Sequence, residues 1–591
     1  MLETRKITCD LCVVGGGIAG MCAAVSAARN GAKVVLMHER SVLGGNASSE
    51  IRMWICGAGM QHNESGIIEE IELENAYRNP TKNWYIWSSI LYDFIKREEN
   101  ITLLLDCPCM DATVEEGNFS DGRTRRIVSV KGYQTTTQRF YEVAAKNFAD
   151  CSGDSILAPL TGAEFMLGRE CKTDFGEPTY VEKADTMTMG MSCLIEGRET
   201  DEKIKFIPSE RATRLSKEDL ENREPDLYNP YENFWYLELG GNRDSIGDTE
   251  DLRDELICLA LGTWNYIKNE EAPRYDTFEL EFLGFIPGKR ESRRMTGEYI
   301  LTANDILSDR DFPDTVAYGG WTVDDHYPAG FYHKGMPNTH IVTPAPYRIP
   351  YRCLYSKNVE NLFFAGRNIS TTHMALSSTR VMKTCALLGQ AVGTAASIAA
   401  KYSLTPHGVY KKKLSLLQNT LLRDDCFLPG RTRTLSPACK SAVFSGDEAL
   451  RDGIDRINRV YNNTSCGAVL ENGRSVSYTF EKPENVGEIH LVFDSDLERE
   501  TFAGDRCEKS HSTRSNILKT SPRQHIPYGL CKAFRVEVIE EDGAKTLLFE
   551  EKNNLLRCRS IPVNRKVKEI SLTVTENHGG TDKTRVYSFD F

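Results

Sequence analysis

Residues 8–39 read TCDLCVVGGGIAGMCAAVSAARNGAKVVLMHE, and this stretch predicts the fold of the N-terminal part of the chain. The apolar run 8–14 predicts a strand, and an Ala-rich helix follows the glycines and closes on an Asn-Gly pair. A second apolar run, 33–38, predicts another strand that ends at Glu39. A strand, a helix and a parallel strand make the βαβ unit with which a doubly wound α/β domain begins.

Three glycines in this unit have the spacing of a nucleotide-binding turn. Gly15, Gly17 and Gly20 form G-x-G-x-x-G directly between strand and helix. Glycine permits a tight turn there and lets a pyrophosphate approach the N-terminus of the helix. Glu39 follows about 20 residues later, where a carboxylate can accept hydrogen bonds from an adenosine ribose. An acidic residue at that point disfavours the 2'-phosphate of NADP, so FAD or NAD is predicted.

The loop after the second strand separates these two cofactors. Glu39 and Arg40 lead into residues 43–49, LGGNASS, which are rich in glycine and hydroxyl groups. Such a loop suits a bound phosphate and a ribityl chain, whereas an NAD domain has no need of it. The sequence therefore predicts FAD.

Composition excludes several classes of protein. A chain of 591 residues exceeds the size of a single core, so two or three domains are expected. Its 40% hydrophobic and 26% charged residues exclude a fibrous or disordered protein. A net charge of -12 works against nucleic acid or an anionic membrane as partner and favours a small-molecule substrate.

The N-terminus and the cysteines point to the cytoplasm. The first residues lack the order of features that a secretory signal needs, and the 18 cysteines are scattered, as buried thiols are in a reducing compartment. Two apolar stretches, 11–28 and 385–400, are too short and too rich in small residues to cross a membrane. We expect no metal site, because Cys9 and Cys12 lie on a predicted strand, where residues three apart point to opposite faces, and Cys107 and Cys109 have no second pair to complete one.

The pattern of apolar and polar residues along the chain predicts an α/β protein with a C-terminal all-β domain. A Rossmann-like FAD-binding domain is expected in two parts, residues 1–165 and 351–410, around an inserted α+β substrate domain, 166–350. A linker, 411–435, leads to residues 436–591. Short runs of alternating apolar residues there, such as 476–480, 489–493, 534–538 and 570–574, predict a jelly-roll β-sandwich.

Several blocks together resemble a known family. They are HERSVLGGNASSEIRMWICGAG, FADCSGDSILAPLTGAEF, PGKRESRRMTGEYILTANDIL, IPYRCLYSKNVENLFFAGRNIS and THMALSSTRVMKTCALLGQAVGTAA. In order and over roughly residues 8–400, they look like the FAD-dependent oxidoreductases common in bacterial carbohydrate-utilising genomes. The resemblance implies the glutathione-reductase-like flavoprotein fold, which is more distantly similar to fumarate reductases.

The resemblance also implies further cofactor contacts. The turn 150–154 would bring the chain back over the FAD site. Arg367 stands where related flavoproteins carry an acid, so it faces the pyrophosphate or the substrate, or else only pairs with a carboxylate. A helix beginning near Ser377 would aim its N-terminus at the flavin pyrimidine edge. The complete predicted set is Gly15, Gly17, Ile18, Ala19, Gly20, Glu39, Arg40, Gly44, Gly45, Asn46, Ser48, Ser49, Cys109, Cys151, Gly153, Asp154, Gly366, Arg367, Arg380, Val381 and Met382.

Catalytic candidates come from residues that could hold a proton or an anion. His373 lies between the last flavin-binding strand and the following helix, where a neutral imidazole could act as general base, or could only form structural hydrogen bonds. His326 could be a base oriented by its neighbouring aspartates or belong to a solvated loop. Arg52, Arg352 and Arg380 are further substrate-side candidates. Only Cys56 follows the first loop, so a dithiol mechanism is rejected.

The C-terminal block RSVSYTFEKPENVGEIHLVFDSDLERE resembles the discoidin-type, galactose-binding-like jelly roll. Such modules often bind sugars, but every tryptophan of this chain precedes residue 322, which removes the best stacking surface. Packing against the catalytic body or a partner subunit therefore remains the favoured role.

These observations predict an FAD-dependent oxidoreductase that transfers hydride between flavin N5 and a CH-OH or CH-CH group of a sugar, a sugar acid or a related carboxylate. An unknown electron acceptor and a homo-oligomer are expected as partners. One alternative is an alkene reductase like fumarate reductase. Another is a carbohydrate-binding or assembly protein with a vestigial flavin domain.

Overall fold

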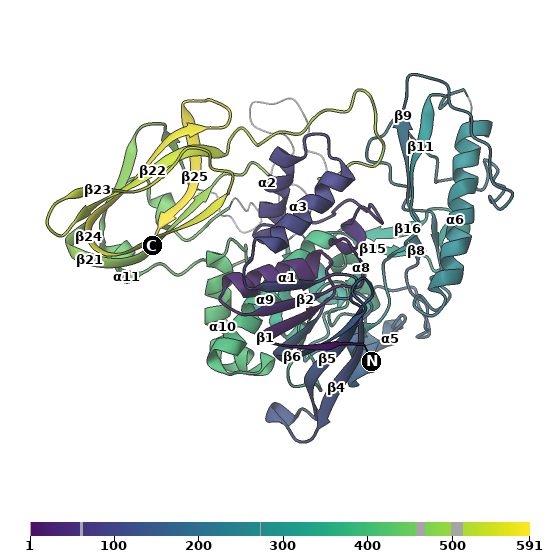
Figure 1. Cartoon of the computed structure of the whole chain (residues 1–591), viewed down its shortest axis with the longest axis horizontal. Helices are drawn as coiled ribbons and strands as arrows, with labels where there is room; N and C mark the ends of the chain where they lie inside the picture. Colours follow the sequence, from purple (N-terminus) through teal and green to yellow (C-terminus); the bar gives the residue numbers. More distant parts are fainter. Residues whose placement is uncertain (1, 59–62, 272, 345, 457–466, 498–511) are drawn as a thin grey trace. The chain divides into compact units, whose positions relative to one another are not determined.

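The computed structural model describes residues 2–58, 63–271, 273–344, 346–456, 467–497 and 512–591 (Figure 1). The chain divides into two compact units. The first comprises Met1–Gly57, Thr81–Leu417 and His511–Arg523, and the second comprises Ala58–Pro80, Gln418–Ser510 and Gln524–Phe591. Each unit therefore combines segments that are far apart in the sequence.

A seven-stranded sheet forms the centre of the first unit, in the order β3-β2-β1-β6-β5-β4, with β18 also paired to β6. The strands around β1 are parallel, as the βαβ pattern predicted, whereas β4 and β5 add an antiparallel edge. This confirms the Rossmann-like class. The strands are β1 (Thr4–Val14), β2 (Val34–Met37), β3 (Ile101–Leu104), β4 (Cys109–Glu116), β5 (Arg125–Gln134), β6 (Arg139–Asp150) and β18 (Leu362–Phe364).

Two helices rich in small residues pack closely beside this sheet, α1 (Ile18–Arg29) and α9 (Met382–Tyr402). A Cβ atom at Gly389 would lie 2.0 Å from the carbonyl oxygen of Ala19, and one at Gly393 would lie 2.2 Å from that of Ala23. Glycine is thus required at both points for the two backbones to touch. This contact brings the start of α9 next to the start of α1.

The single helix expected from Ser377 is wrong. The structure has α8 (His373–Thr379) followed by α9 at an angle of 94°, with Val381 in extended conformation between them. Thr372 caps α8, because its hydroxyl accepts the N–H of Ala375. The first turn of α9 is held elsewhere, since the Lys383 N–H donates to the carbonyl of Cys56 at 2.9 Å.

Within the described residues, no single helix is long and apolar enough to span a membrane. The bent pair α8 and α9 passes that test by length and composition only, and its residues are mostly buried in the protein.

Residues 166–350 form short sheets and one long helix that belong to the first unit. Helix α6 (Thr249–Asn265) lies beside β9 and β11 (Figure 1), and its residues share a core with both strands. The strands are β7 (Phe165–Met166), β8 (Met191–Ser192), β9 (Ile195–Glu199), β10 (Glu238–Leu239), β11 (Phe278–Leu283), β12 (Gly288–Lys289), β13 (Arg294–Met295), β14 (Thr315–Gly319), β15 (Val323–His326), β16 (Asn338–Ile341) and β17 (Tyr347–Pro350).

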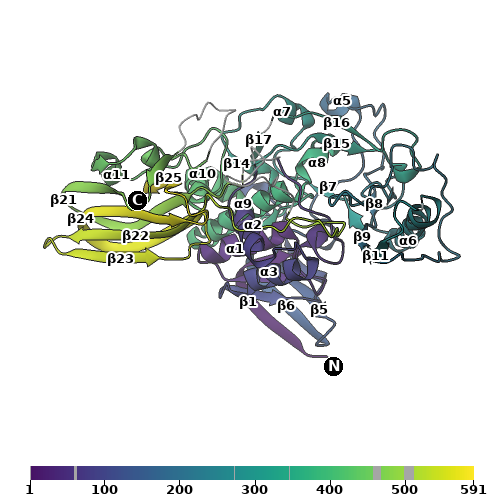
Figure 2. The ribbon, with the colours of Figure 1, turned by 90° about the horizontal axis from the view of Figure 1, so that it is seen from above.

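The second unit is antiparallel throughout its described sheet, in the order β20-β25-β21-β24-β22-β23 with β19 paired to β21 (Figure 2). This confirms the predicted all-β class. The two runs expected at 476–480 and 489–493 are one long strand, bent by register shifts against β24. The strands are β19 (Val443–Ser445), β20 (Ala468–Glu471), β21 (Ser475–Phe493), β22 (Cys531–Glu540), β23 (Lys545–Glu551), β24 (Cys558–Asn577) and β25 (Lys583–Asp590).

Helix α2 (Ile67–Arg78) also belongs to the second unit, and its Leu73 lies in the same apolar core as the strands. The remaining helices are α3 (Trp84–Lys96), α4 (Leu157–Thr161), α5 (Lys172–Phe175), α7 (Ala303–Leu307), α10 (Pro406–Arg423) and α11 (Pro437–Ser441).

Candidate active site

One cavity in the first unit joins widely separated parts of the chain. Both predicted cofactor loops line it, together with the start of α9 and several residues of segment 166–350. Most of the predicted cofactor set lines this cavity: Gly15, Gly17, Ile18, Ala19, Glu39, Arg40, Gly44, Gly45, Asn46, Cys151, Gly153, Gly366, Arg367, Arg380, Val381 and Met382.

The first glycine loop has the tight geometry that a dinucleotide site requires. Gly15 has a φ of +106°, and a Cβ there would lie 2.4 Å from the carbonyl oxygen of Cys151. A Cβ at Gly20 would lie 1.9 Å from the carbonyl oxygen of Gly15. No described side chain caps α1 at Gly17, so the N–H groups of its first turn remain available to a phosphate. The residues present therefore fit an adenine dinucleotide.

Glu39 lies just beyond the end of β2 on the cavity wall, as predicted. Burial acts to raise the pKa of its carboxyl group, but the hydrogen bond and charge of His38 and the charge of Arg40 hold that pKa below its ordinary value. Glu39 is thus ionised at neutral pH and can accept hydrogen bonds from ribose hydroxyls.

Arg367 combines both roles considered for it. Its guanidinium lines the cavity and forms an ion pair with Asp154, Nη2 to Oδ1, at 2.7 Å. Lys289, also on the cavity wall, contacts the other oxygen of Asp154 at 2.9 Å. Burial acts to raise the pKa of Asp154, but these two cations lower it. Arg367, which stands where related flavoproteins carry an acid, therefore has its charge balanced by the carboxylate of Asp154 in the turn 150–154.

The start of α9 reaches the cavity, although the helix begins later than predicted. Arg380, Val381 and Met382 all line it, and no described side chain caps the helix at Val381. The positive end of a 21-residue helix thus faces the ligand space.

Five predicted cofactor residues do not line the cavity. Gly20 contributes through its contact with Gly15, and Asp154 contributes through the cations that it binds. The backbone of Ser48 accepts the N–H of Arg52, which shapes the second loop. Ser49 and Cys109 are the other two, with Cys109 at the start of β4.

Sequence reasoning missed most of the cavity wall opposite the glycine loops. Ser192, Trp235, Gly288, Lys289 and Arg290 come from segment 166–350 and line the same space. The sequence did indicate three of these residues, Gly288, Lys289 and Arg290, because they lie in the block beginning PGKRESRR that supports the family resemblance. Ser192 and Trp235 had no such signal. The remaining lining residues outside the predicted set are Gly16, His38, Ile51, Met53, Cys56, Ser152, Leu194 and Cys385.

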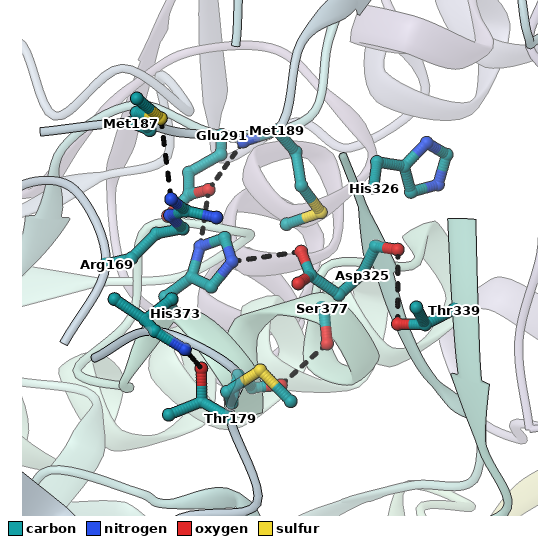
Figure 3. A network of polar contacts seen from close by, with 12 residues as sticks. Arg169, Thr179, Met187, Met189, Glu291, Asp325, His326, Thr339, His373 and Ser377 are labelled. Carbon is teal, nitrogen blue, oxygen red and sulfur yellow. Dashed lines mark hydrogen bonds and ion pairs between the residues drawn. The ribbon is translucent and has the colours of Figure 1, made fainter. Parts of the chain in front are cut away.

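His373 is held between two carboxylates and does not line the cavity (Figure 3). Its Nδ1 lies 2.9 Å from Glu291 and its Nε2 lies 2.9 Å from Asp325, and its side chain is 2% exposed. Burial alone would lower the pKa of this imidazole, but the two carboxylates raise it to about 10. The expected neutral imidazole near pH 7 is therefore wrong, since the ring is a cation whose nitrogens are both engaged.

His326 is a buried residue at the end of β15 rather than part of a solvated loop. Its Nδ1 lies 2.6 Å from Glu238, and its ring meets Trp235 edge-on at 5.2 Å between centroids. His326 itself does not line the cavity, but Trp235 does. The histidine is therefore placed one side chain behind the wall.

Arg52 and Arg352 lie in ion pairs outside the cavity wall. Arg52 is buried 2.6 Å from Glu196, and its guanidinium lies over the ring of Phe282 at 4.1 Å. Arg352 pairs with Asp314 at 2.9 Å. Arg52 and Arg352 are therefore not part of the cavity wall. Of the predicted catalytic residues, Arg380 alone lines the cavity together with the cofactor loops.

The fold and the cavity define a flavin-type dinucleotide-binding protein. The family model described as "FAD dependent oxidoreductase" matches residues 10–421, well over half of the chain. The chain belongs to this family of FAD-dependent oxidoreductases, and FAD is its cofactor.

The similarity of this chain to solved structures is weaker than its match to the family model. p-Nitrophenol 4-monooxygenase PnpA from Pseudomonas putida is 10% identical, with a TM-score of 0.30, over 71% of this chain and 86% of that one. A geranylgeranyl bacteriochlorophyll reductase-like protein from Thermoplasma acidophilum is 12% identical, with a TM-score of 0.29, over 71% and 86%. A family 32 carbohydrate-binding module from Streptococcus pneumoniae EndoD is 16% identical, with a TM-score of 0.17, over 25% and 85%. These scores carry no argument about function, and none of the curated proteins matches the chain.

Proposed function

We propose that this flavoprotein transfers hydride between flavin N5 and a small polar substrate, either at a CH-OH group of a sugar, sugar acid or related carboxylate, or at a CH-CH group of such a molecule. When bound, FAD supplies the hydride acceptor or donor. The chain itself must hold the cofactor, orient the substrate and exclude water.

A single observation carries the proposal. The cavity that is lined by the dinucleotide-binding loops is also lined by Ser192, Trp235, Lys289 and Arg290 of segment 166–350. This second group offers a hydroxyl, an aromatic wall and cations in a partly enclosed space. Such a mixture of one apolar face with a few oriented polar groups is typical of a site for a small polar molecule.

The residues of this wall are held rigidly, which favours orientation of a substrate. Arg290 donates to the hydroxyl of Ser192 and to the carbonyl of Trp235, each at 2.9 Å. Lys289 is fixed by Asp154. Side chains with fixed positions bind a substrate with little further loss of conformational entropy, so they support the alignment that hydride transfer requires.

The start of α9 is suited to stabilise the negative charge that the flavin gains during hydride uptake. Arg380, Val381 and Met382 line the cavity, and no described side chain caps the helix at Val381. A helix N-terminus and a cation favour the negative charge that accumulates on a flavin during hydride uptake.

An anaerobic screen tests the proposal. The oxidised holoenzyme is mixed with sugars, sugar acids and hydroxy acids in a stopped-flow instrument, and the loss of visible flavin absorbance is followed. We expect rapid bleaching by one chemical group of the panel. Bleaching by dithionite but by no member of the panel, together with reoxidation of the reduced enzyme by unsaturated carboxylates, would instead support the alkene reductase.

We also propose a cytoplasmic location, which the free thiols of the described cysteines support, because such thiols persist in a reducing compartment. Cell fractionation with an antibody against the protein tests this.

A further inference from the structure

Arg290 and Arg380 both line the cavity. Arg290 directly follows β12, and Arg380 lies between α8 and α9. Burial lowers the pKa of Arg290; the charge of Glu238 acts to raise it, and the charge of Arg380 lowers it further. Two like charges close together in a poorly hydrated space repel each other, and an anion between them removes the repulsion.

The carboxylates that hold these arginines do not line the cavity. Glu238 lies 3.4 Å from Arg290, and Asp324 lies 3.1 Å from Arg380. His326 joins the two carboxylates, with Nδ1 2.6 Å from Glu238 and Nε2 3.5 Å from Asp324. These acceptors hold both guanidinium groups, and the two arginines themselves line the ligand space.

Other cations of the wall have nearer partners. Lys289 and Arg367 both bind Asp154, at 2.9 and 2.7 Å. Arg290, in contrast, donates at 2.9 Å only to neutral acceptors, the Ser192 hydroxyl and the Trp235 carbonyl. In addition, the buried Nε of Arg380 has no hydrogen-bond partner among the described residues, which is also true of the Nε of Arg367. This wall therefore has unused capacity to bind an anion.

The support behind the pair extends to the charged His373. Glu291 and Asp325 follow Arg290 and Asp324 in the sequence, and His373 bridges them (Figure 3). The two segments that carry the arginine pair and its acceptors are thereby tied together by a buried cation. An anion site needs such preorganisation, because loosely held guanidinium groups would lose entropy on binding.

We propose that Arg290 and Arg380 form a carboxylate subsite, so that the substrate is a small carboxylic acid, such as a sugar acid or hydroxy acid, and not a neutral sugar. Arginine presents paired N–H donors that match the two oxygens of a carboxylate. Trp235 supplies an apolar wall for the carbon skeleton beside them. That the bound acid is the substrate rests on the proposed function. Binding of the acid can be measured without turnover.

The test is a binding experiment with malonate on the oxidised holoenzyme, read by the flavin difference spectrum and by calorimetry. Malonamide is the matched neutral probe. We expect malonate to bind and malonamide to bind at least about tenfold more weakly, because charge-assisted hydrogen bonds are roughly twice as strong as neutral ones. Failure of the wild-type protein to bind malonate, or equal binding of both probes, overturns the subsite.

Variants locate the site. Arg290→Met and Arg380→Met should each weaken malonate binding by at least about tenfold, while Arg290→Lys keeps the charge and should lose less. Arg293→Met is the matched control, because Arg293 lies three residues on and does not line the cavity. Melting temperature and bound FAD are recorded for each variant, and Arg290→Lys serves if Arg290→Met does not fold.

The same variants separate a substrate anion from the phosphates of the cofactor. If the pair binds the substrate, FAD affinity of Arg290→Met stays within about twofold of the wild type while its malonate affinity falls. If Arg290→Met loses FAD and its remaining holoenzyme binds malonate normally, the proposal is wrong and the pair holds the cofactor. A hydride-transfer screen without any active substrate would contradict the proposed function but would leave these binding results intact.

Discussion

The guanidinium of Arg380 donates twice to Asp324, once to its carboxylate and once to its backbone carbonyl, each at 3.1 Å. Arg380 precedes α9 and Asp324 lies in β15, so this contact ties the flavin-facing end of the helix to segment 166–350. The start of α9 and strand β15 are thus connected by hydrogen bonds. Changes in β15 should therefore alter ligand binding without touching the glycine loops.

Glu39→Ala should weaken FAD binding by about tenfold. A ribose-facing carboxylate contributes about 1.5 to 3 kcal/mol per charge-assisted hydrogen bond, and the Glu39 side chain is 45% exposed, so the lower figure applies. Fluorescence titration of the apoprotein with FAD measures the change. Glu142→Ala, on β6 away from the cavity, is the control and should bind FAD normally. Unchanged affinity in Glu39→Ala would remove Glu39 from the ribose site.

Gly20→Ala should abolish FAD binding or folding. The new Cβ would lie 1.9 Å from the backbone oxygen of Gly15, and neither backbone can move without opening the phosphate loop. Gly487→Ala is the matched control, because its Cβ would meet no atom within 4 Å. Melting temperature and bound flavin are measured for both. A stable, yellow Gly20→Ala protein would contradict the geometry of this loop.

His373→Gln should destabilise the protein by about 3 kcal/mol at pH 7, because Asp325 loses its ion pair with the buried imidazolium, while Glu291 keeps its contact with Arg294. The pKa of His373 is raised to about 10, so its stabilisation is complete below the unfolded value near 6.5 and is lost as pH rises through about 10. Urea unfolding at several pH values should show the difference between wild type and variant shrinking over that window. His340→Gln, with a 52% exposed side chain, should show no such trend.

FAD should be released by acid precipitation and appear in the supernatant. Cys151 lines the cavity, but burial raises the pKa of its thiol, so it remains protonated and is a poor nucleophile toward the cofactor. Colour that stays with the precipitated protein would show a covalent link, and peptide mapping would then identify the attached residue.

The cofactor half of the site could be predicted because its signals are local. Gly15, Gly17 and Glu39 are separated by fixed distances along one βαβ unit, and the turn geometry explains each of them. The loop with Gly44 and Gly45 follows directly. No long-range contact is needed to place these residues near one ligand.

The substrate half could not be predicted for the opposite reason. Trp235 and Arg290 come together only through short strands, and no periodicity in segment 166–350 indicates which residues face inward. The sequence alone leaves His373 open between a general base and a structural hydrogen-bonding residue, because its partners, Glu291 and Asp325, are 82 and 48 residues away. The contact of the first turn of α9 with the carbonyl of Cys56 is likewise long-range, so helix propensity cannot indicate it.

The exchange of segments between the two units limits how this protein can be dissected. Residues 58–80, with α2 and its core residue Leu73, belong to the C-terminal unit, whereas residues 511–523 belong to the N-terminal one. A fragment that begins at residue 418 would lack a helix of its own core, and one that ends at residue 417 would carry that helix without its strands. Genes cut at the apparent domain boundary should therefore yield insoluble halves, and only co-expression or a circularly permuted chain would return the complete units.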